Sequence, residues 1–99
     1  MHPRPESVVR ITFDEANERE LIRHRVTPGE VIEVFDNDPL WRTNRRDRAG
    51  NRQAIGRTYG GRLLTVVAIW DASTRVLRPI TAWEASPAER TSYVNSGRV

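Results

Sequence analysis

The feature that most constrains the fold is an almost unbroken apolar run at residues 62–70 (RLLTVVAIW). Because the run has no polar face, it predicts a strand that is covered on both sides and lies centrally in a sheet. Gly60 and Gly61 come directly before it, and residues 52–59 (RQAIGRTY) form a second strand-like stretch before them. A diglycine between two such stretches is a strong signal for a β-hairpin. The fold is therefore expected to be built around this hairpin.

The N-terminal part of the chain predicts a strand followed by a helix. Residues 8–13 (VVRITF) are β-branched and aromatic, as is typical of a strand. Asp14 then opens the segment DEANERELIRHR, which is acidic in its first turn and basic in its last, as the helix dipole favours. Helical spacing predicts an inward stripe made of Asn17, Leu21 and His24.

Two capping boxes predict two further helices. Thr27-Pro28-Gly29-Glu30 and Ser86-Pro87-Ala88-Glu89 both place a hydroxyl at the N-cap, proline at the first helical position and glutamate two residues later. The first box predicts a helix to about Phe35, and the second predicts a short helix through Tyr93. The residues expected to face inward from the first of these helices are Val31, Ile32 and Phe35.

The remaining segments complete a small sheet. Trp41 follows a turn signal and is expected to begin a short edge strand, and residues 45–51 are expected to form a polar loop. Residues 75–83 (RVLRPITAW) predict another strand, in which Pro79 indicates an edge position or a bulge because it cannot donate a ladder hydrogen bond. The predicted class is α+β: a mostly antiparallel sheet of four to five strands, two N-terminal helices and a short C-terminal helix.

Length and composition predict one domain over residues 1–99, with residues 1–8 as a flexible tail. A chain of 99 residues has room for a single core, and its lack of cysteine excludes disulfides and thiolate sites. No apolar run approaches the roughly 20 residues that span a bilayer, and no signal-peptide pattern is present. We therefore expect a soluble cytoplasmic protein with no membrane partner.

Charge is distributed unevenly along the chain. Between Asp14 and Asp38 there are eight acidic residues and three arginines, whereas between Arg42 and Arg62 there are seven arginines and one acidic residue. All 16 cationic side chains are arginine. Arginine content alone is weak evidence for phosphate recognition, but the clustering of arginines indicates an anionic partner such as phosphate.

Several kinds of site are excluded or unsupported by the sequence. The glycines do not form a phosphate-binding loop before a helix, and the only histidines are His2 and His24, too few for a histidine metal site. No EF-hand spacing occurs among the acidic residues. We expect no metal ion and no cofactor.

The strongest candidate site is a set of arginines on neighbouring predicted strands: Arg52, Arg57, Arg62, Arg75 and Arg78. Such an array can hold a phosphodiester and stabilise the charge of a pentacoordinate phosphorane. The alternative is a solvated sheet face with surface salt bridges.

Three other side chains have two interpretations each. His24 is either a general base or a residue that packs beside Leu21 and caps the end of its helix. Trp83 and Tyr93 either stack on RNA bases or belong to the core or to a protein interface.

Three blocks, covering about residues 11–93, resemble a known family. They are ITFDEANERELIRHRVTPGEVIEVFDNDPL, RQAIGRTYGGRLLTVVAIW and RPITAWEASPAERTSY. In this order and spacing they resemble the BrnT toxins, small ribonucleases with a RelE-like fold from bacterial type II toxin–antitoxin pairs. The sequence departs from the family pattern at Asn17 in place of lysine, Arg25 in place of glycine, Pro79 in place of isoleucine and Trp83 in place of arginine.

The resemblance implies metal-independent cleavage of mRNA, which inhibits translation and growth. The ribose 2′-hydroxyl would attack the adjacent phosphate and leave a 2′,3′-cyclic phosphate and a 5′-hydroxyl. Arg62 and Arg78 would stabilise the phosphorane, and His24 would transfer protons, with Tyr93 and Glu84 as further candidates. The residues expected to bind RNA or phosphate are Arg52, Arg57, Arg75 and Trp83.

The resemblance also implies partners. The first is the RNA substrate. The second is a cognate antitoxin with its own DNA-binding region, and the protein would contact operator DNA only in a complex with this antitoxin. Self-association as a homodimer is a further possibility. The alternative function is a module that binds RNA or the antitoxin and is weakly active or inactive in cleavage, because Trp83 replaces a cation of the implied active surface.

Overall fold

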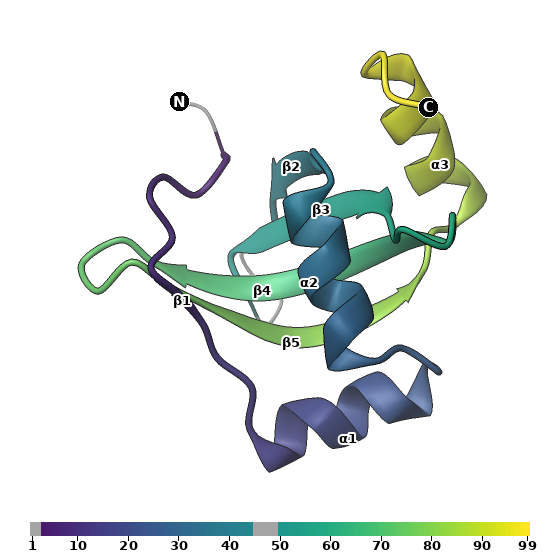
Figure 1. The fold of residues 1–99 in the computed structure, drawn as a ribbon. Helices are drawn as coiled ribbons and strands as arrows, with labels where there is room; N and C mark the ends of the chain where they lie inside the picture. The colour runs from purple at the N-terminus through teal and green to yellow at the C-terminus, as the bar shows by residue number, and fades with distance from the viewer. Residues whose placement is uncertain (1–2, 45–49) are drawn as a thin grey trace.

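The protein is a five-stranded sheet with three helices, within the part of the chain that the computed structural model describes, residues 3–44 and 50–99 (Figure 1). The predicted α+β class is confirmed. The strands are β1 (Arg10–Ile11), β2 (Leu40–Thr43), β3 (Arg52–Arg57), β4 (Leu63–Asp71) and β5 (Val76–Glu84), and the helices are α1 (Glu15–Arg23), α2 (Pro28–Asp36) and α3 (Pro87–Asn95). The loop predicted at residues 45–51 lies largely outside the described residues.

The apolar run lies in the middle of the sheet, as predicted. The strand order is β1-β5-β4-β3-β2, and every pairing is antiparallel except that of β1 with β5. β2 forms one edge of the sheet, as predicted for the strand at Trp41. β1 is shorter than the predicted 8–13 because only its two residues pair in register with β5.

Pro79 occupies a position where a missing N–H group does little harm. β1 pairs only with Val76 and Leu77, so it has ended before Pro79 is reached. The register between β4 and β5 also shifts between Val67 and Ala68, opposite this part of β5. The predicted edge position or bulge is confirmed, because both conditions are met.

The helices begin where their caps predict. Both capping boxes form: Thr27 Oγ1 accepts from the Glu30 N–H at 3.1 Å, and Ser86 Oγ accepts from the Glu89 N–H at 3.2 Å. Asp14 is the N-cap of α1, where its Oδ1 accepts from the Asn17 N–H at 2.8 Å.

Two of the predicted inward positions are wrong. His24 is exposed, because α1 ends at Arg23 and His24 is its C-cap. Ile32 is 46% exposed, whereas Val31 and Val34 are fully buried. These two valines are three residues apart on the face of α2 that meets the sheet, and Ile32 lies on the flank of that face.

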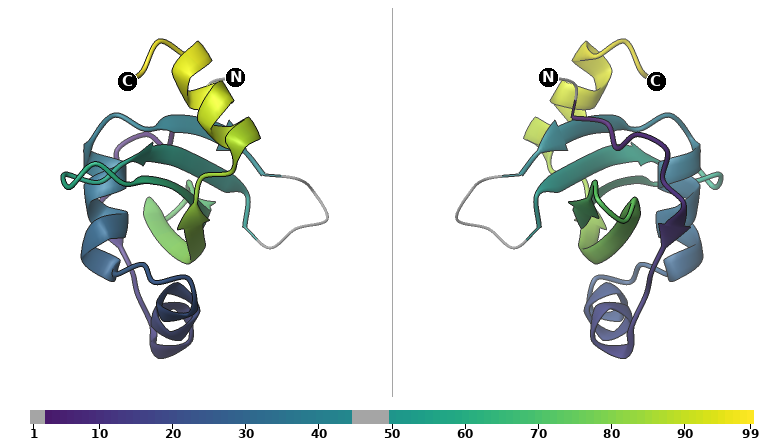
Figure 2. Two further views of the ribbon diagram at one scale, coloured as in Figure 1. Left: turned by 90° about the vertical axis from the view of Figure 1, so that its right-hand side faces the viewer. Right: turned by 90° about the vertical axis from the view of Figure 1, so that its left-hand side faces the viewer.

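The core has two parts, one on each face of the sheet. Helices α1 and α2 cover one face, where Leu21, Val26, Val31 and Val34 pack with Ala54, Leu64, Val66 and Ala82. On the other face Tyr93 of α3 packs with Ile55 and Leu63. α1 and α3 lie at opposite ends of the molecule (Figures 1 and 2).

The described part of the N-terminal segment contacts the sheet. Pro5 is buried, and the carbonyl of Pro3 accepts a hydrogen bond of 2.8 Å from Arg52 Nε. The Val9 N–H donates to the Arg75 carbonyl at 2.9 Å, just before β1. Residues 3–9 thus follow the end of the sheet at which β5 begins.

Candidate functional site

Four of the nine predicted site residues lie together where α1, α2, β4 and β5 meet. They are His24, Arg62, Trp83 and Glu84, and we call this group the Trp83 corner. The rings of His24 and Trp83 are 6.4 Å apart between centroids, and Arg62 Nη2 is 3.4 Å from Glu84 Oε1. Because these residues come from three distant segments, it is the fold that brings them together.

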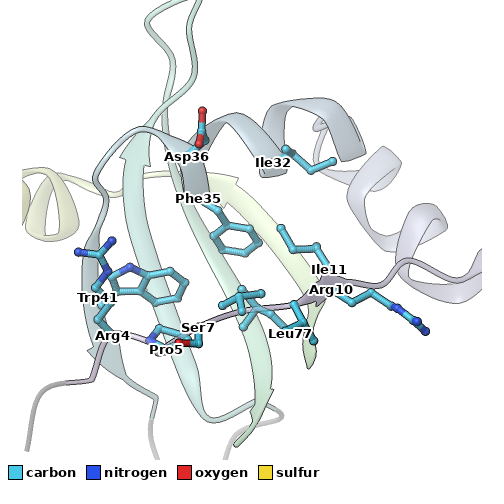
Figure 3. A pocket seen from close by; sticks show the side chains of 12 residues that line it. Arg4, Pro5, Ser7, Arg10, Ile11, Ile32, Phe35, Asp36, Trp41 and Leu77 are labelled. Carbon is cyan, nitrogen blue, oxygen red and sulfur yellow. The ribbon is translucent and has the colours of Figure 1, made fainter. Parts of the chain in front are cut away.

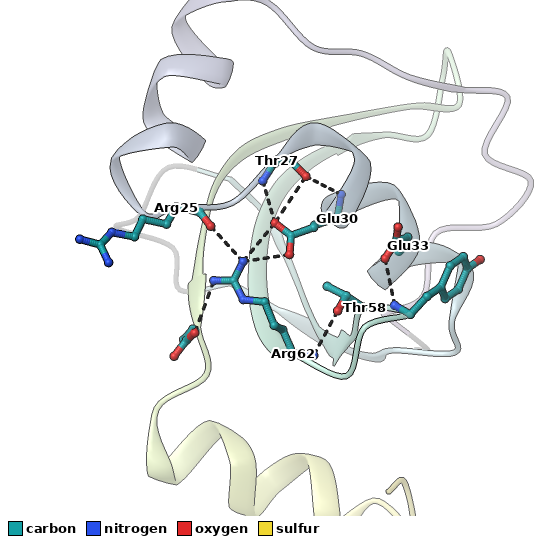
Figure 4. Close-up of polar contacts among 8 residues, drawn as sticks. Arg25, Thr27, Glu30, Glu33, Thr58 and Arg62 are labelled. Atoms are coloured by element: carbon teal, nitrogen blue, oxygen red, sulfur yellow. Dashed lines mark hydrogen bonds and ion pairs between the residues drawn. The ribbon is translucent and has the colours of Figure 1, made fainter.

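Arg62 is the most tightly held residue of the Trp83 corner (Figure 4). Its Nη1 donates to both carboxylate oxygens of Glu30, at 3.0 and 2.9 Å, and to the carbonyl of Arg25 at 2.9 Å. Glu84 approaches the other guanidinium nitrogen, Nη2. The side chains of Arg62 and Glu30 are 32% and 23% exposed, whereas that of Glu84 is 73% exposed. Nη2 is therefore the guanidinium nitrogen of Arg62 that an incoming anion reaches most easily.

The pKa values of this pair reflect their contact. Burial raises the pKa of Glu30, but the hydrogen bonds from the Thr27 N–H and from Arg62 outweigh it, so that this pKa is below its ordinary value. The hydrogen bond to Glu30 raises the pKa of Arg62. Both groups are charged at neutral pH, and the charge of Arg62 is partly cancelled.

His24 has a carboxylate that can orient it. Its Nε2 is 3.4 Å from Glu20 Oε1, and the same oxygen accepts from Thr81 Oγ1 at 3.4 Å. The His24 side chain is 39% exposed. An exposed imidazole beside a carboxylate is an arrangement that can accept and return a proton.

Trp83 is held by the first turn of α3. Its Nε1 donates to Glu89 Oε1 at 3.0 Å, and that oxygen also accepts from the Ser86 N–H at 2.7 Å. Burial raises the pKa of Glu89, but the hydrogen bonds from the Ser86 N–H and Trp83 outweigh it and leave this pKa below its ordinary value. Trp83 is half-buried, so part of its indole ring faces solvent beside His24.

Arg78 does not join the Trp83 corner. It lies five residues before Trp83 on β5, which is about 17 Å of strand. Its Nη2 is 2.6 Å from Asp14 Oδ2, and it thereby ties β5 to the N-cap of α1. The hydrogen bonds from the Asn17 N–H and Arg78 hold the pKa of Asp14 below its ordinary value. The contact gives Arg78 a structural function in this conformation.

Tyr93 and Arg57 pack against each other on the face that carries α3. Tyr93 is 4% exposed, and the Arg57 guanidinium carbon lies 5.8 Å from the centroid of its ring. Arg57 Nη1 also donates to the Gly61 carbonyl at 2.8 Å, which fixes it to the hairpin turn. A ring so deeply buried offers little surface to RNA, and its contacts are those of a core residue.

Arg52 and Arg75 lie at the far end of the sheet. Arg52 pairs with Ala68 near the end of β4, whereas Arg62 precedes the start of β4. Arg75 occupies the turn between β4 and β5. Of the nine predicted residues, four thus form the Trp83 corner. Three others, Arg57, Arg78 and Tyr93, make structural contacts elsewhere, and Arg52 and Arg75 lie at the far end of the sheet.

A shallow apolar groove runs between α2 and the N-terminal segment (Figure 3). It has a volume of about 480 Å³, and its floor includes Phe35 and Trp41, whose rings are stacked 5.5 Å apart. Asp36 is the only carboxylate among the described residues that line it. The groove lacks the convergent acid and base groups that the Trp83 corner has.

Sequence reasoning missed the three carboxylates that complete the Trp83 corner: Glu20, Glu30 and Glu89. The capping boxes did identify Glu30 and Glu89 as N3 residues, but not their contacts with Arg62 and Trp83. The contact between Glu30 and Arg62 joins residues 32 positions apart and depends on how α2 crosses the sheet. A histidine four residues after Glu20 was the one local signal for its contact with His24.

The Trp83 corner thus brings together the imidazole of His24, the guanidinium of Arg62 and the half-buried indole of Trp83. Among the residues described, no group of three or more His, Asp or Glu side chains is arranged to hold a metal ion. No helix in the described segments is long and apolar enough to cross a membrane.

A scan against protein-family models finds no match, and a search of the curated proteins finds no significantly similar sequence.

Proposed function

We propose that this protein is a metal-independent RNA endonuclease of the BrnT type, with a RelE-like fold, and that it acts as the toxin of a type II toxin–antitoxin pair. The observation that supports it most is that His24 and Arg62, from two of the blocks that resemble the family, lie in one corner with Trp83, which stands where the family has arginine. His24 and Arg62 supply proton transfer and phosphate binding, which RNA transesterification requires, and Trp83 supplies a surface on which a base can stack.

In the proposed mechanism, a base of the RNA strand stacks on the exposed part of Trp83. His24, oriented by Glu20, removes the proton from the ribose 2′-hydroxyl, and the resulting oxyanion attacks the adjacent phosphorus. The bond between phosphorus and the 5′-oxygen breaks, and His24 returns the proton it removed to this oxygen, so that the products are a 2′,3′-cyclic phosphate and a 5′-hydroxyl. Arg62 binds a non-bridging phosphate oxygen through Nη2, which requires Glu84 to swing away. Because Glu84 is highly exposed, moving its side chain costs little free energy.

A cognate antitoxin is the protein partner that the proposal implies. It would cover the Trp83 corner, inhibit cleavage and supply the DNA-binding region of the complex. The proposed site of action is the cytoplasm, where mRNA is translated.

The experiment compares RNA cleavage by the wild-type protein with that by His24→Gln. Labelled single-stranded RNA is incubated with each protein in excess chelator. Because general acid–base catalysis contributes about 10²–10⁴-fold, His24→Gln is expected to cut at least 100-fold more slowly. Arg19→Ala is the matched control, since Arg19 lies on the same helix and is 70% exposed. Its rate should stay within about twofold of the wild type. Equal rates for the wild type and His24→Gln would remove His24 from the mechanism.

A second candidate function is a module that binds RNA or the antitoxin without cutting RNA. It is favoured by the ion pairs of Arg62 with Glu30 and of Arg78 with Asp14, which occupy the two arginines expected to stabilise the phosphorane. In the same assay this module would bind RNA, and neither the wild type nor the control variant would release cyclic-phosphate products.

A further inference from the structure

A second basic site lies at the end of the sheet opposite the Trp83 corner. It is a shallow pocket of about 490 Å³ between the N-terminal segment and the strand ends, lined by Arg4, Glu6, Ser7, Arg52, Trp70, Ala72 and Arg75. We call it the Arg52 pocket. Its described lining has three arginines and one carboxylate, so its net charge is positive.

Arg52 is positioned by neutral partners. Its Nε donates to the Pro3 carbonyl at 2.8 Å, and its Nη1 donates to the Asn51 carbonyl at 3.0 Å. These two bonds restrain the guanidinium without cancelling its charge, unlike the carboxylates that hold Arg62 and Arg78. A cation restrained before the ligand arrives loses less entropy on binding.

Arg75 adds a second cation at the same place. It is exposed, and among the described residues no ion pair includes Arg75 or Arg52. Its backbone has a φ of 56°, in the left-handed region, where the turn between β4 and β5 closes. The Val9 N–H donates to its carbonyl and fixes the turn against the N-terminal segment.

Trp70 gives the Arg52 pocket an aromatic wall. The side-chain amide of Asn51 holds the backbone of Trp70 on both sides: Oδ1 accepts from the Trp70 N–H at 2.7 Å, and Nδ2 donates to the Trp70 carbonyl at 3.0 Å. These two hydrogen bonds extend the contact between β3 and β4 beyond the last paired residue, Arg52. They therefore keep Trp70 beside Arg52, with the indole ring half-buried.

The Arg52 pocket is distinct from the Trp83 corner. Arg62 precedes the first residue of β4, whereas Trp70 lies near its last residue and Arg75 lies in the turn beyond it. The eight residues from Arg62 to Trp70 span about 26 Å of strand. One short nucleotide cannot occupy both sites.

Two arginines that form no ion pair among the described residues, beside a half-buried indole ring, match the chemistry of one nucleotide in a flexible strand. The guanidinium groups bind the phosphate, and the base stacks on the indole. We propose that the Arg52 pocket is a second binding site for single-stranded RNA that takes one backbone phosphate at Arg52 and Arg75 and one base at Trp70. This inference goes beyond the proposed function, because it concerns binding and needs no cleavage.

The test measures binding of a fluorescently labelled 12-nucleotide RNA whose 2′-hydroxyls are methylated, so that it cannot be cut by 2′-hydroxyl attack. Arg75→Asn removes the charge, and asparagine tolerates the left-handed backbone. Arg90→Gln is the matched control, because it removes one exposed arginine from α3, away from the pocket. The dissociation constant is measured at several salt concentrations.

Arg75→Asn should weaken binding about 3–10-fold and reduce the slope of log affinity against log salt by about 0.7, the value for one contact to a single strand. Trp70→Ala should weaken binding roughly 5–100-fold and leave the slope unchanged. Arg90→Gln should stay within about twofold of the wild type. If Arg75→Asn behaves like Arg90→Gln, the proposal is wrong, whether or not the wild type cuts RNA.

Two competitors distinguish the sources of phosphate. A nucleoside monophosphate should displace the labelled RNA at lower concentration than inorganic phosphate does, because only the nucleotide carries a base for Trp70. Equal competition by inorganic phosphate would contradict the stacking part of the proposal. Binding of a duplex DNA of the same length as tightly as the RNA would contradict the single-strand assignment.

Discussion

At the scale of single residues, Gly56 in β3 shows how closely two segments of this fold approach each other. A Cβ atom at this position would lie 2.9 Å from Pro39 Cβ, 3.2 Å from Pro39 Cα and 3.3 Å from Val34 Cγ1. Two of these atoms belong to a rigid proline ring and its backbone, so they cannot move aside easily. The turn after α2 can pack on the sheet only because residue 56 has no side chain.

Gly56→Ala is expected to destabilise the protein by about 1–3 kcal/mol, the usual range for overpacking in a core. Gly29→Ala is the matched control, because at residue 29 the nearest atom to the new methyl group is Thr27 Oγ1 at 3.8 Å. Alanine suits a helix better than glycine does, so the control should be stabilised by about 0.5 kcal/mol. Urea unfolding measures both, and equal effects would show that the contact with Pro39 does not constrain the fold.

At the scale of elements, Arg62 connects the start of β4 with α2 and with the turn before it. It extends from the start of β4 to Glu30 in the first turn of α2, and to the carbonyl of Arg25 in the turn between α1 and α2. The same carboxylate caps α2 through the Thr27 N–H. Glu30 thus serves both the helix end and the packing of α2 on the sheet.

Arg62→Ala is expected to lower the free energy of unfolding by about 1.5–3 kcal/mol, because it leaves a half-buried carboxylate without its charged donor. Glu84→Gln should change it by less than about 0.5 kcal/mol, since Glu84 is highly exposed. Thermal or urea unfolding checks both values. Loss of RNA cleavage in Arg62→Ala would identify a catalytic function only at a temperature where the variant is shown to be folded.

Local signals predicted the elements well and the side-chain partners poorly. The apolar run, the diglycine turn and the two capping boxes each depend on residues within a few positions of one another, and each is confirmed. The partners of Arg62 and Arg78 are 32 and 64 residues away, and no local pattern encodes such contacts. His24 was expected to face inward because the helical period was extended one residue past the end of α1.

At the scale of the whole molecule, the uneven charge along the chain is partly cancelled by folding. Asp14 and Glu30 come from the acidic N-terminal part, and they pair with Arg78 of β5 and with Arg62, which directly precedes β4. Arg52 and Arg75 are among the arginines that form no ion pair with a carboxylate of the described residues. These two arginines lie together at the end of the sheet away from the Trp83 corner.

Stability should fall in acid. The pKa values of Asp14, Glu30, Asp71 and Glu89 are all below their ordinary values in the folded protein. The unfolded chain therefore binds more protons than the folded one as the pH falls below the ordinary carboxyl values of about 4. The contribution of these groups is complete above that range and is lost as the pH drops through their lower folded values. Urea unfolding at pH values from 7 to 3 measures it, and an unfolding free energy that rises on acidification would contradict this description.

The proposal that the Trp83 corner cuts RNA by 2′-hydroxyl attack is tested most directly by a substrate that lacks this group. Wild-type protein is given two labelled RNAs in excess chelator, one fully ribose and one with 2′-deoxyribose at the position that is cut. The first should yield fragments with 2′,3′-cyclic phosphate and 5′-hydroxyl ends, and the second should stay intact at that position. Cleavage of both substrates, or of neither, would contradict the proposed mechanism.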